Sequence, residues 1–240
     1  VYKRQAHFYD LNGDEIEKET TEIKWDAEAA EKAGFEHFMM KEIYEQPKTI
    51  NDTISPRIKD NDIVIEELNM SDEEIKEITK IHIVACGSAY HTGVTAKYVI
   101  EGLARIPVEV DVASEFRYRD PILQKGNMVI VISQSGETAD TLAALRESRE
   151  RGFKVLGIVN VVGSSIAREA DSVMYTWAGP EIAVATTKAY SAQLTALYML
   201  AMKFARVRGT IDQEKFAGML TDLRCLPDQI ELLLGQKEKI

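Results

Sequence analysis

The chain has 240 residues, 45% hydrophobic and 28% charged, a balance that is typical of a globular protein and excludes a disordered or fibrous one. Its 29 Lys and Arg residues against 39 Asp and Glu residues give a net charge of −10, which argues against nucleic acid or an anionic membrane as a partner. No apolar run reaches the roughly 18 residues of a membrane-spanning helix, and two cysteines cannot form a disulfide framework, so we expect a cytoplasmic protein.

The first two dozen residues are polar and carry a turn signal at Asn12-Gly13. The segments on either side of this turn predict a short β-hairpin. Because such a hairpin is too small to bury a core, we interpret residues 1–24 as the tail of a preceding domain and 25–34 as a linker. The chain starts without Met, and we expect it to be the middle of a longer protein, with residues 35–240 as one domain.

Residues 35–80 have a helical pattern. Apolar side chains recur at the 3.6-residue spacing of a helix from Phe35 to Tyr44, and Pro47 and Pro56 predict breaks after it. Ser71, followed by three acidic residues, predicts the N-cap of a short helix.

From residue 81 onward, apolar runs alternate with helical segments. The expected strands are 81–86, 108–112, 128–132, 155–159 and 172–176. The expected helices are 89–103, 138–151, 165–169, 187–206 and 212–234. Because the strongest runs are apolar along their whole length, they predict a parallel sheet buried between helical layers, an α/β fold.

Two of the predicted strand ends carry hydroxyl groups, and ligands of open parallel sheets bind beyond such ends. Ser88 follows the first strand, and the segment 133–138, with two serines, a glycine and a threonine, follows the central one. Hydroxyls beside the free N–H groups of a helix start can hold a phosphate without a lysine. The same hydroxyls could be plain N-caps, but their occurrence at two strand ends favours a phosphate site.

Other cofactor motifs are absent from the sequence. Neither the dinucleotide fingerprint Gly-x-Gly-x-x-Gly nor the P-loop pattern occurs, and the four histidines lack metal-ligand spacing. We therefore expect no cofactor and no metal. Cys86 is interpreted as a small residue lining the site, and Lys188 as part of an ion pair or a helix start. Arg117 and Arg119 could either support an anionic ligand or pair on the surface.

Several motifs together resemble the glutamine–fructose-6-phosphate aminotransferase (isomerizing) family, the glucosamine-6-phosphate synthases. They are 41–47 (KEIYEQP), 85–90 (ACGSAY), 113–119 (ASEFRYR), 133–141 (SQSGETADT) and 181–188 (EIAVATTK). The Ser-x-Ser-Gly element alone indicates the wider SIS (sugar isomerase) superfamily. The resemblance implies a flavodoxin-like, three-layer αβα sandwich with a five-stranded parallel sheet, the first SIS domain of that family. Residues 1–24 resemble the end of the family's glutaminase domain.

The resemblance also implies a ligand, fructose 6-phosphate or glucosamine 6-phosphate, and the residues that bind it. Its phosphate would be held by Ser133, Gln134, Ser135 and Thr138, with Ser88 as a further hydroxyl and the backbone of Val184 against the sugar. No catalytic residue is assigned, because the family's catalytic groups belong to its glutaminase domain and to a second SIS domain that this chain lacks. The resemblance thus implies binding without turnover.

As part of such an enzyme, the chain would help convert glutamine and fructose 6-phosphate to glutamate and glucosamine 6-phosphate, the amino sugar that feeds UDP-N-acetylglucosamine biosynthesis. The resemblance further implies a cytoplasmic homodimer. Two alternatives stay open: a stand-alone SIS module that senses sugar phosphates, and an SIS-type amino-sugar deglycase. A sensor would usually carry a basic DNA-binding unit, which the charge of −10 disfavours, and a deglycase would lack the glutaminase-like residues.

Overall fold

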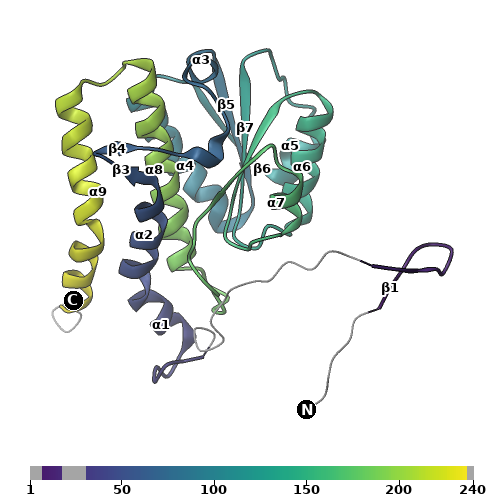
Figure 1. The fold of residues 1–240 in the computed structure, drawn as a ribbon, viewed down its shortest axis with the longest axis horizontal. Helices are drawn as coiled ribbons and strands as arrows, with labels where there is room; N and C mark the ends of the chain where they lie inside the picture. Colours follow the sequence, from purple (N-terminus) through teal and green to yellow (C-terminus); the bar gives the residue numbers. More distant parts are fainter. Residues whose placement is uncertain (1–6, 18–30, 237–240) are drawn as a thin grey trace.

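The computed structural model describes residues 7–17 and 31–236 (Figure 1). It begins with the antiparallel hairpin of β1 (Phe8–Tyr9) and β2 (Glu15–Ile16). The Asp10 carboxylate shapes the turn by accepting hydrogen bonds from the N–H groups of Asn12, at 2.8 Å, and Asp14, at 2.9 Å. The predicted hairpin is therefore confirmed, with shorter strands. Most of the predicted linker 25–34 lies outside the described residues, and the domain boundaries stay a prediction.

The helical region after residue 35 contains α1 (Phe38–Tyr44) and α2 (Gln46–Ile54), followed by a 3-10 turn, Ser55–Arg57. Pro47 and Pro56 both stand in the first turn of their helical segments, where a backbone N–H has no helical partner to lose. The prolines thus mark starts of elements, as predicted.

A small hairpin of β3 (Ile58–Lys59) and β4 (Asp62–Ile63) follows, then a 3-10 turn at Glu66–Leu68. This hairpin was not predicted from the sequence. The next helix, α3 (Asp72–Lys76), starts at the predicted N-cap Ser71, whose hydroxyl accepts the N–H of Glu74 at 3.2 Å in a capping box.

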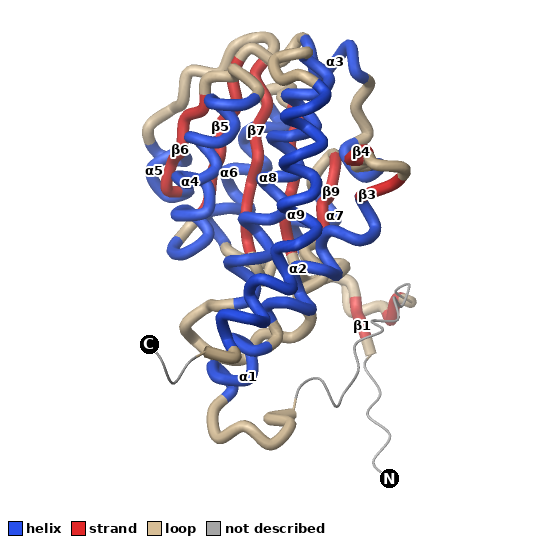
Figure 2. The backbone as a smooth tube through the Cα atoms, turned by 90° about the vertical axis from the view of Figure 1, so that its left-hand side faces the viewer, coloured by secondary structure: helices blue, strands red, loops and turns tan. Residues whose placement is uncertain are grey.

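Five parallel strands form the main sheet, at the places where the sequence predicts them (Figure 2). They are β5 (Lys80–Ala85), β6 (Val108–Val112), β7 (Asn127–Ser133), β8 (Lys154–Val159) and β9 (Ser172–Tyr175). Their order in space is β6-β5-β7-β8-β9, with parallel pairing throughout. The order of this flavodoxin-like sheet reverses between β5 and β7, and this switch point is where such sheets bind ligands.

Helices cover both faces of the sheet (Figure 1). They are α4 (Gly87–Leu103), α5 (Ala113–Tyr118), α6 (Ala139–Glu150), α7 (Ser165–Glu169), α8 (Lys188–Arg208) and α9 (Gln213–Leu234). Along β7, Ile130 and Ile132 pack with α4, α8 and α9, while Val129 and Val131 pack with α5, α6 and α7. The three-layer αβα fold is thereby confirmed. Within the described ranges, no helix has both the length and the apolar character to cross a bilayer.

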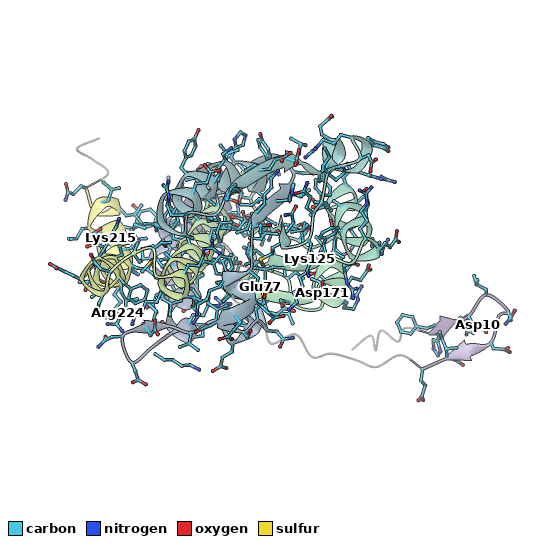
Figure 3. The ribbon with its side chains drawn as sticks, turned by 90° about the horizontal axis from the view of Figure 1, so that it is seen from above. Asp10, Glu77, Lys125, Asp171, Lys215 and Arg224 are labelled. Atoms are coloured by element: carbon cyan, nitrogen blue, oxygen red, sulfur yellow. The ribbon has the colours of Figure 1, made fainter. Side chains whose placement is uncertain are left out.

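The two ends of the parallel strands carry different residues. In the view from above, Glu77, Lys125 and Asp171 lie at the near edge, where β5, β7 and β9 begin (Figure 3). The carboxyl ends of the strands, followed by the hydroxyl-bearing segments, lie at the opposite side of the domain. The same view shows Asp10 on the N-terminal hairpin, apart from the αβα body (Figure 3).

Candidate functional site

A cavity of about 270 Å³ opens at the carboxyl ends of β5 and β7. Its lining comes from residues within 86–89, 132–138 and 181–186, together with position 193 on α8. The structure brings all six residues that the sequence analysis named for ligand binding to this one cavity: Ser88, Ser133, Gln134, Ser135, Thr138 and Val184. The cavity lies at the switch point of the sheet, where the topology favours a ligand site.

Residues 133–138, called the serine loop below, connect β7 to α6. The Ser133 hydroxyl accepts a hydrogen bond from the Gly136 N–H at 3.0 Å, and the Ser135 hydroxyl accepts one from the Glu137 N–H at 3.2 Å. The Ser133 and Thr138 hydroxyls lie 3.0 Å apart. Because the Ser135 oxygen serves as an acceptor within the loop, its own proton stays available for an anion.

Gly136 is the residue that allows the serine loop to approach its neighbour so closely. Its φ is +67°, and a Cβ built there would fall 2.0 Å from the Ser164 Oγ, so only glycine fits. The Gly136 carbonyl accepts the Ile166 N–H at 3.0 Å, and the Gln134 carbonyl accepts the Asn160 N–H at 3.1 Å. The loop is therefore fixed on the segment that follows β8.

Glu137 lies in the serine loop but does not line the cavity. Its carboxylate accepts the Ser165 N–H at 2.7 Å. The Ser165 side chain and then this backbone hydrogen bond lower the pKa of Glu137. The carboxylate is bonded at the start of α7 and lies outside the lining of the cavity, so we assign it no role as a base there.

Two long helices begin at the cavity. Cys86 is the N-cap residue of α4, and Thr138 is the N-cap residue of α6. The first turn of each helix has N–H groups without helical partners and a partial positive charge. None of the described lining residues is a lysine or an arginine. The site can thus hold an anion with hydroxyls, backbone N–H groups and helix dipoles.

Glu181 lies in the 181–186 part of the lining and adds a carboxylate to the cavity. This carboxylate accepts hydrogen bonds from the Thr186 hydroxyl, at 3.0 Å, and from the N–H groups of Thr187, at 3.0 Å, and Ala189, at 3.1 Å. Glu181 therefore accepts hydrogen bonds from free N–H groups at the start of α8, and its negative charge is offset by the N-terminal dipole of that helix.

The loop 181–187 is also attached to the first helix of the domain. Glu42 of α1 is only 2% exposed, and one of its oxygens accepts the N–H groups of Ile182, at 2.7 Å, and Ala183, at 3.1 Å. Beside it, buried Lys188 pairs with Glu45 at 2.6 Å. The predicted ion pair of Lys188 is confirmed, and the two contacts fix the wall of the cavity to α1.

Other residues weighed in the sequence lie as follows. Cys86 lines the cavity, as interpreted, and the Thr141 hydroxyl donates to its Sγ at 3.8 Å. Arg119 pairs with Asp111 at 2.8 Å, and Arg117 pairs with Asp140 at 3.4 Å. Neither arginine is among the lining residues of the cavity, so of the two alternatives the structure shows surface pairing.

One possible set of metal ligands was not foreseen from sequence spacing. Single ligand atoms of His82, Glu109 and Asp111 lie within 4.8 Å of one another, because neighbouring β5 and β6 carry them. However, Arg119 pairs with both carboxylates, and Lys80 pairs with Glu109. These cations already balance the two negative charges, and we assign no metal to this cluster.

Among the polar lining residues, Glu181 enters the sequence analysis only as part of a motif, and Gln193 was missed altogether. Gln193 lies in the apolar stretch of α8, and its only signal is that of a lone amide in a helix rich in Ala, Leu and Met. Nothing in a single sequence says which face of such a helix meets the cavity.

Comparison with known proteins gives a family and several relatives. The SIS domain family model matches residues 74–203. A protein of Caldanaerobacter subterraneus subsp. tengcongensis named glutamine–fructose-6-phosphate aminotransferase [isomerizing] is 57% identical over 241 residues, which cover 100% of this chain and 40% of that protein. A protein of the same name from Clostridium acetobutylicum is 57% identical, with 98% and 39% covered. The chain thus spans about 40% of the length of these curated relatives.

Solved structures show the same fold. The C-terminal domain of glucosamine-fructose-6-phosphate aminotransferase from Francisella tularensis superposes with a TM-score of 0.82 at 38% identity, covering 87% of this chain and 58% of that one. A putative phosphosugar isomerase from Silicibacter pomeroyi gives a TM-score of 0.68 at 24% identity, covering 81% of this chain and 56% of that one. This second likeness shows the fold alone.

Proposed function

The chain belongs to the SIS domain family, and on that basis we propose that it is the first SIS domain of a glutamine–fructose-6-phosphate aminotransferase. The names of relatives at 57% identity support this assignment. In this proposal residues 1–24 end a glutaminase domain, 25–34 form a linker, and 35–240 form the SIS domain. The intact enzyme would also contain a second SIS domain.

The proposed ligand is a hexose 6-phosphate, either fructose 6-phosphate or glucosamine 6-phosphate. The observation that carries this proposal is the convergence of the serine loop and two helix starts on one cavity. Its volume of about 270 Å³ is slightly below the roughly 300–1,000 Å³ of small-molecule sites, which favours a sugar phosphate over a dinucleotide.

Each predicted site residue has a place in this proposal. Ser133, Ser135 and Thr138 would donate hydroxyl protons to the phosphate oxygens, and Gln134 would contribute beside them. Ser88, at the start of α4, and the backbone of Val184, in the 181–187 loop, would contact the sugar from the other walls. The described residues would bind the ligand, while the catalytic groups would belong to other domains.

In the whole enzyme, this domain would hold fructose 6-phosphate while nitrogen from glutamine is transferred to it, giving glucosamine 6-phosphate and glutamate. The product would feed UDP-N-acetylglucosamine biosynthesis. A cytoplasmic location and a homodimeric isomerase region belong to the same proposal. Compared with a sugar-phosphate sensor or an amino-sugar deglycase, the aminotransferase is favoured by the names that the 57% identical relatives carry.

Titration calorimetry on the 240-residue chain tests the proposal. We expect fructose 6-phosphate and glucosamine 6-phosphate to bind and to raise the Tm, whereas fructose without its phosphate does neither. Equal binding of fructose would contradict a phosphate-centred site. With glutamine and fructose 6-phosphate present, the chain should accumulate no glucosamine 6-phosphate, and measurable turnover would show that catalytic groups lie within it.

A further inference from the structure

Gln193 is a residue of α8 whose amide has no hydrogen-bond partner among the described residues. It lies in α8 and lines the cavity, although only 3% of the residue is exposed. Within residues 7–17 and 31–236, its carboxamide makes no hydrogen bond. A carboxamide offers two donors and one acceptor oxygen, and those of Gln193 are not among the fully enclosed polar atoms of the described residues, although the residue as a whole is buried. The donors and the acceptor of this amide are therefore available to a ligand in the cavity.

The neighbouring polar side chains of α8 behave differently. The Thr195 hydroxyl donates to the Ser191 carbonyl at 2.8 Å, and the Ser191 hydroxyl donates to the Gln46 side chain at 2.5 Å. Lys188 forms its ion pair with Glu45. These three side chains of α8 thus have partners within the protein, and Gln193 is the exception among the four.

Gln193 and the serine loop belong to different layers. α6, which continues the serine loop, covers one face of the sheet, and α8 covers the other. A ligand whose phosphate lies in the serine loop can therefore extend its carbon chain across the cavity toward α8. The groups along that chain in a sugar phosphate are neutral hydroxyls, which match the paired donor and acceptor of an amide better than a charged side chain would.

We propose that Gln193 is a specificity-determining residue that recognises the hydroxyl groups of the sugar, while the serine loop takes the phosphate. This inference rests on the proposed function and adds to it a group that selects polyhydroxylated phosphates. A site built to hydrogen-bond a hydroxyl discriminates against ligands that lack it, because its own buried polar group is then left unpaired.

The test compares two ligands in two variants by calorimetry. Gln193→Met keeps the length of the side chain and removes its donors and acceptor. We expect it to bind fructose 6-phosphate about tenfold more weakly and inorganic phosphate as the wild type does. Gln193→Asn, which keeps the amide but shortens its reach, should also weaken fructose 6-phosphate selectively, and it serves as the second variant if Gln193→Met does not fold.

The Tm without ligand separates recognition from a structural role. Because Gln193→Met removes an amide that makes no hydrogen bond to the described residues, we expect its ligand-free Tm to stay close to that of the wild type or to exceed it. Thr195→Val is the matched control: Thr195 is also buried in α8, is not among the lining residues of the cavity, and its hydroxyl is bonded. This variant should have a lower Tm than the wild type and an unchanged affinity for fructose 6-phosphate.

The outcomes distinguish the two proposals. If both Gln193 variants bind fructose 6-phosphate as tightly as the wild type does, the inference about Gln193 is wrong and the proposed function stands. Equal weakening of fructose 6-phosphate and inorganic phosphate would also overturn it, since the amide would then act on the phosphate site. If the wild type binds no hexose 6-phosphate, the proposed function fails and the inference fails with it.

Discussion

The Ser133 Oγ lies 3.0 Å from the Thr138 Oγ1, so the last residue of β7 and the N-cap residue of α6 close the serine loop on each other. One of these hydroxyls donates to the other, and the second keeps its proton for a ligand. Together with Ser135, the loop presents several donors in fixed positions. Their arrangement leads to the first prediction.

Replacing Ser135 and Thr138 together with alanine should weaken fructose 6-phosphate binding roughly hundredfold, because two hydrogen bonds of about 1–1.5 kcal/mol each are lost. Thermal shift with and without the ligand measures this loss. Ser148→Ala is the control, since its hydroxyl is also buried, lies on α6 and bonds only to the Ala144 carbonyl. An unchanged thermal shift in the double variant would place the phosphate elsewhere.

Gly136→Ala should destabilise the chain and abolish ligand binding. The positive φ alone costs about 1–2 kcal/mol for alanine, and the new Cβ would overlap with Ser164. Gly163→Ala separates the two effects, because Gly163 has a φ of +72° with nothing near its missing Cβ. Urea unfolding should show the larger loss for Gly136→Ala, and adding Ser164→Gly should recover part of it. Equal losses in both glycine variants would argue against the overlap.

Removing the Glu42 carboxylate should loosen the 181–187 loop. Glu42→Ala leaves two N–H groups of the loop without their charged acceptor, and we expect a loss of about 2–3 kcal/mol of unfolding free energy. Weaker binding of fructose 6-phosphate should accompany it, because Val184 and Thr186 belong to the same loop. Glu66→Ala, at an exposed ion pair, should change neither quantity much. Full retention of affinity would mean that the loop holds its position without Glu42.

His82 should make the stability depend on pH. Burial, and then the nearby Lys80 charge, lower the pKa of His82, so the folded chain keeps the ring neutral. The unfolded chain takes up a proton below about pH 6.5, and the unfolding free energy should therefore fall as the pH drops from about 7 toward the lowered pKa. His82→Gln should flatten this slope in urea titrations, whereas His91→Gln, at an exposed position, should keep it. An unchanged slope in His82→Gln would contradict the prediction.

The sheet and the serine loop could be predicted because their signals are local. Buried parallel strands have continuous apolar runs, and the hydroxyls of 133–138 follow such a run directly. The contact between Glu42 and Ile182 could not be predicted, since 140 residues separate them and nothing in either segment specifies the other. The β3–β4 hairpin was missed for another reason: strands of two residues show no periodicity.

The absence of lysine and arginine among the described lining residues has a consequence for how a ligand would arrive and leave. A site made of dipoles attracts an anion only at short range, whereas the net charge of −10 repels it at long range. Raising the ionic strength should therefore speed the capture of a sugar phosphate instead of slowing it. Without a permanent counter-ion to hold the ester, its residence time should be short.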